Sequence, residues 1–112
     1  MATLPFAEGL TLTIRFRPFT PRIIFHADQR LTVEILEGEN AGFSDTVEYQ
    51  ATELRPNLVV LSWQERIGST IVHVMDFDSR QSYTVMAPAK GRLLRLQGPI
   101  ERSAPQSRHA PF

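Results

Sequence analysis

A glutamate and a histidine that could move a proton, Glu65 and His73, lie in an apolar stretch between Leu58 and Phe77. Carboxyl and imidazole groups are frequent general acids and bases, and burial shifts the pKa of a carboxyl toward neutrality. The stretch consists of two runs rich in Val, Ile and aromatic residues, separated by Arg-Ile-Gly at positions 66–68. This pattern predicts a β-hairpin with a three-residue loop, whose glycine takes the left-handed conformation.

The loop length predicts which residues of the hairpin lie opposite each other. The expected pairs are Glu65 with Ser69, Trp63 with Ile71, Leu61 with His73, and Val59 with Met75. These side chains share one face, which is apolar apart from Glu65 and His73. Two titratable groups on an aromatic, apolar surface indicate the lining of a ligand cavity. We expect Glu65 and His73 to be the catalytic pair if there is a reaction, with Trp63, Ile71 and Met75 against the ligand.

Both titratable residues also have a purely structural interpretation. Glu65 adjoins the predicted turn and is explained equally as a solvated residue at the rim. His73 lies in mid-strand between valines, where a histidine satisfied by hydrogen bonds within the core is common. The three histidines, His26, His73 and His109, lack the spacing of a metal site, so we expect no metal and no cofactor.

Composition narrows the classes of partner. The 12 basic and 12 acidic residues of this 112-residue chain cancel and form no long block, which argues against nucleic acid and anionic membranes as partners. No apolar run approaches the roughly 20 residues of a membrane span, and the N-terminus lacks a secretory pattern. The absence of cysteine fits a reducing compartment. We expect a cytoplasmic protein with one domain over residues 1–102 and a flexible tail over 103–112.

Outside the hairpin, alternation of apolar and polar residues predicts further strands. They cover residues 10–16, 22–26, 31–35, 46–52, 83–86 and 94–100, with a polar loop over 37–45. Tyr49 points inward with Val47 and joins the expected ligand-binding set. Tyr83 is placed in that set as well, although the loop before it leaves the parity of its strand open.

About eight short strands with turns between neighbours are typical of a barrel or a sandwich. The short sequential connections favour an all-β, up-and-down antiparallel barrel of calycin-like type, whose interior can hold one small ligand. A sandwich, an open half-barrel and an oligonucleotide-binding Greek-key barrel are the alternatives.

The central hairpin also carries a family resemblance. Its Ser62-Trp63-Gln64-Glu65 followed by Ile67-Gly68-Ser69-Thr70 is similar to the Ser-Trp-x-Glu and Gly-Thr hairpin of phenolic acid decarboxylases. The longer run from Tyr49 to Gly98 resembles the MoaF-like family of calycin-type barrels. Both families imply a compact barrel with a central apolar cavity, usually dimeric, and the decarboxylases imply a catalytic role for Glu65.

The resemblance to the decarboxylases has gaps. Those enzymes need a tyrosine pair on an early strand, where this chain has Thr11, Thr13 and Arg15, and an arginine that has no match near Phe43. Decarboxylation of a hydroxycinnamate is therefore not carried over. The sequence favours a protein that binds a small hydrophobic or aromatic molecule. The alternative is a cofactor-free lyase or isomerase in which Glu65 and His73 transfer a proton.

A homodimer is expected from the opposite face of the same hairpin. Leu58, Val60, Val72 and Val74 would form an apolar patch outside the barrel, which is unusual on a monomer.

Overall fold

The computed structural model describes residues 2–3 and 6–103, and within them the chain forms β-strands joined by turns, with no helix. The strands are β1 (Ala2–Thr3), β2 (Thr11–Ile14), β3 (Phe19–His26), β4 (Arg30–Gly38), β5 (Ser44–Arg55), β6 (Leu58–Gln64), β7 (Thr70–Asp76), β8 (Gln81–Ala87) and β9 (Leu94–Ser103). In this part of the chain, accordingly, no helix is long and apolar enough to cross a membrane.

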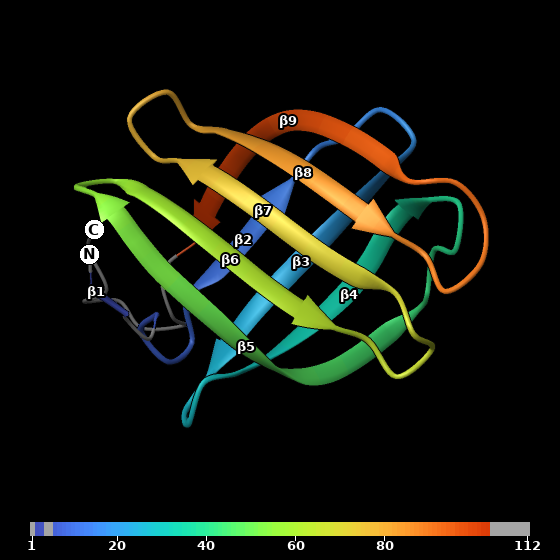
Figure 1. Ribbon diagram of the computed structural model, residues 1–112, viewed down its shortest axis with the longest axis horizontal. Coiled ribbons are helices and arrows are strands. Elements are labelled where there is room, and N and C mark those ends of the chain that lie inside the picture. The colour runs from blue at the N-terminus through green and yellow to red at the C-terminus, as the bar shows by residue number, and fades with distance from the viewer. Residues whose placement is uncertain (1, 4–5, 104–112) are drawn as a thin grey trace.

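Strands β2 to β9 form a closed antiparallel barrel in which each strand pairs with the next along the chain (Figure 1). The pairing of β2 with β9 closes the circle and sets Ile14 opposite Ile100. The short β1 pairs with β5 at Thr52 and Glu53, beyond the residues of β5 that pair with β4. The predicted up-and-down barrel is confirmed, and the sequential pairing excludes the Greek-key and open alternatives.

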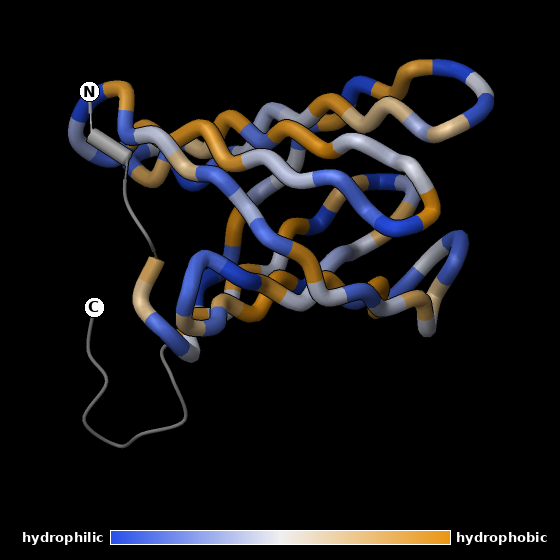
Figure 2. Tube along the Cα trace, turned by 60° about the horizontal axis from the view of Figure 1, so that its bottom comes forward, coloured by the Kyte–Doolittle hydropathy of each residue, from blue (hydrophilic) through white to orange (hydrophobic). Residues whose placement is uncertain are grey.

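Alternation along the strands fills the interior. Figure 2 shows hydrophobic and hydrophilic segments following one another along the strands. In β2 the inward residues Leu12 and Ile14 are fully buried, and in β5 Tyr49 is buried as predicted. The sequence left the orientation of β3 open, and the structure turns Ile23 and Phe25 inward. Each strand thus presents one apolar face to a single shared core.

The structure shows which side chains of strand β8 face the barrel interior, a question that the sequence left open. Ser82 and Thr84 are its inward residues, with exposed fractions of 0% and 3%. Tyr83 therefore faces outward and is 46% exposed. Its expected place in the ligand-binding set is wrong, because residues 77–80 form a turn that sets the strand one residue away from the register that would turn Tyr83 inward.

Several element boundaries differ from the sequence prediction. β3 begins at Phe19, earlier than expected, and accommodates Pro21 at a register irregularity in its pairing with β4. The polar loop expected over 37–45 is reduced to 39–43, because β4 and β5 extend into it. Ser103 closes β9, and residues 104–112 of the predicted tail lie outside the described part of the chain.

Two strands change partners and so bend the barrel into two facing sheets. β5 pairs with β4 as far as Glu48 and with β6 from Tyr49 onward, while β9 passes from β8 to β2 after Pro99. Gly98 lies at the bend of β9. A Cβ atom there would lie 2.5 Å from the carbonyl oxygen of Arg15, so this close approach of two strands requires glycine.

The two ends of the barrel differ. One end, which we call the closed end, is covered by Phe6, whose ring stacks on Phe25 with a centroid distance of 4.3 Å. The backbone N–H of Phe6 donates to the hydroxyl oxygen of Tyr49 at 2.9 Å. The other end, the open end, consists of the loops over 15–18, 39–43, 65–69 and 88–93, which gather at the right of Figure 1.

The outer face of β6, β7 and β8 carries a row of apolar side chains, the outer patch. Its members are Leu58, Val60, Val72, Val74, Tyr83 and Val85. Val74 lies at the centre, because it pairs with Val60 on one side and Tyr83 on the other.

We propose that a second copy of the chain covers the outer patch. Sedimentation at tens of micromolar, roughly the range in which a micromolar interface is populated, should give a dimer. Val74→Lys should give a monomer, because a charge at the patch centre would have to be desolvated. Thr70→Lys, farther along the same face of β7, should stay dimeric. A wild-type monomer at that concentration would contradict the proposal.

Candidate functional site

An apolar pocket of about 540 Å³ lies among the loops of the open end. Seven of its lining residues are apolar: Pro18, Phe19, Ile35, Phe43, Ile67, Met86 and Leu94. Two lining residues are acidic, Glu39 and Glu65. Its rim keeps Ile67 62% and Leu94 41% exposed, so large hydrophobic side chains border the opening. We call this space the mouth pocket.

A narrow space continues from the mouth pocket toward the barrel interior. Its volume is about 20 Å³, close to the room needed by one water molecule and too little for a ligand. Phe19, Ile35, Glu65 and Met86 line both spaces. Glu65 therefore lies at the floor of the mouth pocket, at the entrance to the core.

The hairpin that carries Glu65 has the predicted geometry. Trp63 pairs with Ile71, and Leu61 pairs with His73. The Glu65 N–H donates to the Ser69 carbonyl at 2.8 Å, and the Gly68 N–H donates to the Glu65 carbonyl at 2.8 Å. Gly68 has a φ of 98°, as a loop of this kind requires. Glu65 and His73 do project from the same face, which confirms the predicted register.

The Glu65 side chain is 9% exposed and is held by the indole of Trp63. Trp63 Nε1–H donates to Glu65 Oε2 at 3.1 Å. Burial raises the pKa of Glu65 above its usual value, an effect that the Trp63 hydrogen bond partly offsets and the negative charge of Asp45 reinforces. The carboxyl is thus a preorganised hydrogen-bonding group in an apolar environment.

Asp45 holds the loop that carries Glu65. Its Oδ2 accepts from the backbone N–H of Arg66 at 2.9 Å, and its Oδ1 lies 3.1 Å from Arg66 Nε. The sequence prediction missed Asp45 because it began the strand at Thr46. The sequence did contain an indication of its position. Asp45 is two residues before Val47 and four before Tyr49, so alternation along the strand places it on the same inward face, at the start of β5.

His73 lies deeper and is satisfied within the core. Its Nδ1 is hydrogen-bonded to Thr84 Oγ1 at 2.6 Å, and Ser82 Oγ lies 3.4 Å from the same nitrogen. The ring is stacked on Phe16 at a centroid distance of 6.4 Å and tilted against Trp63 at 5.1 Å. Burial lowers the pKa of His73 to about 3, so the imidazole is neutral at physiological pH.

The expected ligand-binding residues are spread over different parts of the barrel. Trp63 and Ile71 line the narrow space, together with His73. Met75 belongs to the packed middle, where it, Phe25, Leu31 and Leu61 are each 0% exposed, so no water-sized space touches them. The expectation of a central ligand cavity is therefore wrong in location, because side chains fill the centre.

Tyr49 is hydrogen-bonded at the closed end, and it is also one of the residues that line the outer pocket described below. Its hydroxyl accepts the Phe6 N–H, and its ring meets Phe25 edge-on at 5.3 Å. The sequence prediction also missed the mouth residues Phe19, Ile35 and Met86, which lie near the ends of strands where alternation says little about depth.

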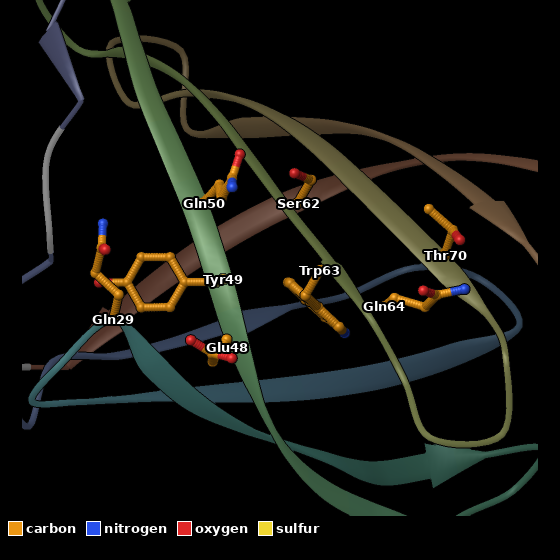
Figure 3. A pocket seen from close by; sticks show the side chains of 8 residues that line it. All are labelled: Gln29, Glu48, Tyr49, Gln50, Ser62, Trp63, Gln64 and Thr70. Carbon is orange, nitrogen blue, oxygen red and sulfur yellow. The ribbon is translucent and has the colours of Figure 1, made fainter.

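A second, shallower pocket lies outside the barrel over β5, β6 and β7 (Figure 3). It has a volume of about 430 Å³, and its exposed lining residues are polar, among them Glu48, Gln50 and Gln64. No group of three or more His, Asp or Glu side chains within the described ranges is arranged to hold a metal ion.

Comparison with known proteins agrees with this barrel. No curated protein matches the chain. A solved structure does, with a TM-score of 0.84 and 28% sequence identity, covering 92% of this chain and all of the other. That structure is of a protein described as a putative beta-lactamase from Burkholderia vietnamiensis. The model of the MoaF-like family matches residues 8–101. The chain thus belongs to the MoaF-like family.

Proposed function

We propose that this MoaF-like protein binds a small hydrophobic or aromatic molecule in the mouth pocket, with Glu65 beside the polar group of the ligand. The observation that carries the proposal is the meeting of an apolar pocket with one buried carboxyl at its floor. Ligand sites are commonly lined by apolar side chains with a few placed polar groups.

Size and surface character support this location. The volume of about 540 Å³ falls within the range of roughly 300–1,000 Å³ that is usual for small-molecule sites. Exposed hydrophobic side chains scattered singly need no explanation, but Ile67 and Leu94 border the same hollow. A hydrophobic ligand would cover both and so remove apolar surface from water.

The structural neighbour is described as a β-lactamase, but this chain does not carry the residues of serine β-lactamase chemistry. Serine β-lactamases use a Ser-x-x-Lys motif, in which the serine attacks the substrate. The sequence contains a single lysine, Lys90, and the residue three positions before it is Ala87. The chain therefore lacks the residues that would carry that chemistry.

The enzymatic alternative, a cofactor-free lyase or isomerase, depends on Glu65 and His73 acting together. Glu65 has the environment of a general acid or base, since burial raises its pKa. His73 does not fit the role of its partner, because its Nδ1 is already bonded to Thr84 and its pKa of about 3 makes it a weak base. Binding is therefore the function that the geometry supports better.

Binding at the mouth can be tested with a neutral solvatochromic dye such as Nile red. We expect a saturable fluorescence increase, weakened about fivefold by Leu94→Asn, because a half-buried leucine contributes roughly 1 kcal/mol to an apolar contact. Leu36→Asn is the matched control, since Leu36 is 39% exposed and Leu94 41%, but Leu36 does not line the pocket. Equal effects of the two substitutions would contradict binding at the mouth.

The neutral state of His73 can be tested through the pH dependence of stability. The unfolded chain takes up a proton near pH 6.5, whereas the folded protein does so near pH 3, so stability is lost as pH falls through that window. One such proton contributes about 1.4 kcal/mol per pH unit. Denaturant unfolding of His73→Gln should lack this component.

His26→Gln is the control for that experiment, because His26 lies on the outer face and is half-buried. It should keep the acid sensitivity of the wild type. Direct titration of the imidazole resonances by NMR would give the answer independently of any variant. A His73 signal that titrates between pH 6 and 7, roughly the range of a free imidazole, would restore the proton-transfer role.

A further inference from the structure

We propose that the ligand of the mouth pocket is an organic cation, with an apolar body and a protonated amine that binds the carboxylate of Glu65. This inference rests on the proposed function and names the chemical class of its ligand. The geometry points to it through the signs of the charges around the pocket and through the way in which Glu65 is held.

The charged side chains that line the mouth pocket are acidic, whereas the basic residues of the surrounding loops, among them Arg17, Lys90 and Arg92, are outside its lining. Glu39 from the loop before β5 and Glu65 from the hairpin both line the pocket, and no Arg or Lys does so among its described lining residues. A cation is present nearby, Arg66, but its backbone N–H and its guanidinium both bind Asp45, and its side chain is 77% exposed. Arg66 is therefore paired with Asp45 and does not supply a partner for Glu65, whose pKa is raised further by the charge of Asp45.

His73, which faces Glu65 from β7, adds no charge at physiological pH. It lies behind Glu65 along the narrow space and is bonded to Thr84. The pocket and its walls thus place near Glu65 the carboxylates of Glu39 and Asp45, a guanidinium already paired with Asp45, and one neutral imidazole. An anionic ligand would meet repulsion from Glu65 and Glu39 in a site where water screens poorly.

The hydrogen bond from Trp63 leaves Glu65 ready to accept another donor. Trp63 Nε1 binds Oε2, so Oε1 is available at the floor of the pocket. A neutral hydroxyl could donate there, but an ammonium adds to the hydrogen bond the attraction between two opposite charges. It also compensates the carboxylate for the water lost on burial, which no neutral donor does to the same extent. The apolar wall then accepts the rest of the ligand.

Three probes of matched shape separate the possible ligand classes: 4-phenylbutylamine, 4-phenylbutan-1-ol and 4-phenylbutanoate. Calorimetry on the full chain near neutral pH should rank the amine tightest, about tenfold above the alcohol, because the ammonium adds an ion pair to the hydrogen bond. The carboxylate should bind weakest. The fluorescence of Trp63, the single tryptophan, gives a second readout, because Trp63 lies against Glu65.

Glu65→Gln should remove the preference for the amine, while the alcohol should lose less affinity than the amine, because its hydroxyl can still donate to the amide oxygen. Glu48→Gln is the matched control, because it deletes the same charge from the exposed outer face of β5. It should keep the tenfold preference. In the wild type, the affinity for the amine should fall as acid protonates Glu65, whereas the affinity for the alcohol should not.

Each outcome decides between the two proposals. Equal binding of amine and carboxylate, or a preference that survives Glu65→Gln, would overturn the inference while binding of Nile red and the alcohol still upheld the proposed function. Failure of Nile red and of all three probes would overturn the proposed function, and the inference with it. The ranking in the wild type stands as a test even if Glu65→Gln folds poorly.

Discussion

Closure of the sheet through the pairing of β2 with β9 is the constraint on which the rest of this structure depends. A closed barrel has no unpaired strand edges along its circumference, and each of its strands must bury every second side chain. With so small a circumference the inward side chains meet across the barrel and fill it. The bend of β9 at Gly98, where another residue would collide with the carbonyl of Arg15, allows the strand to pass from one sheet to the other.

Because the centre is filled, depth along the barrel decides what each titratable group can do. Glu65 and His73 share one face of one hairpin, yet Glu65 lies at the floor of an opening and His73 lies among Phe16, Trp63 and Thr84. At the deeper position an imidazole is tolerated when it is neutral and hydrogen-bonded. At the shallower position a carboxyl can ionise when a suitable ligand compensates it. The two residues therefore belong to different parts of the molecule, one to the core and one to the pocket.

Most of the fold follows from local pattern, whereas the shape of the site does not. Alternation of side chains and the Gly68 loop predict strands, hairpin register and the inward face of β5, and these are confirmed. Periodicity gives parity but not depth, so it cannot show that Met75 is packed while Met86 borders a pocket. The parity of Tyr83 depended on the length of the turn before it. The N–H of Phe6, bound to Tyr49, is a contact between distant residues that alternation does not reveal.

One end of the barrel is covered, and the other end contains the pocket. Phe6 covers the closed end, so access to the pocket is from the open end, where the hairpin loop presents Glu65. Asp45 accepts from the backbone N–H of Arg66 and pairs with its Nε, and so fixes that loop without bringing a positive charge to Glu65. If Arg66 bound Glu65 instead, the floor of the pocket would be neutral and would offer a ligand little beyond apolar contact. The buried aspartate pairs with the guanidinium of the hairpin loop, and Trp63 holds the carboxyl of Glu65 in position at the floor of the pocket.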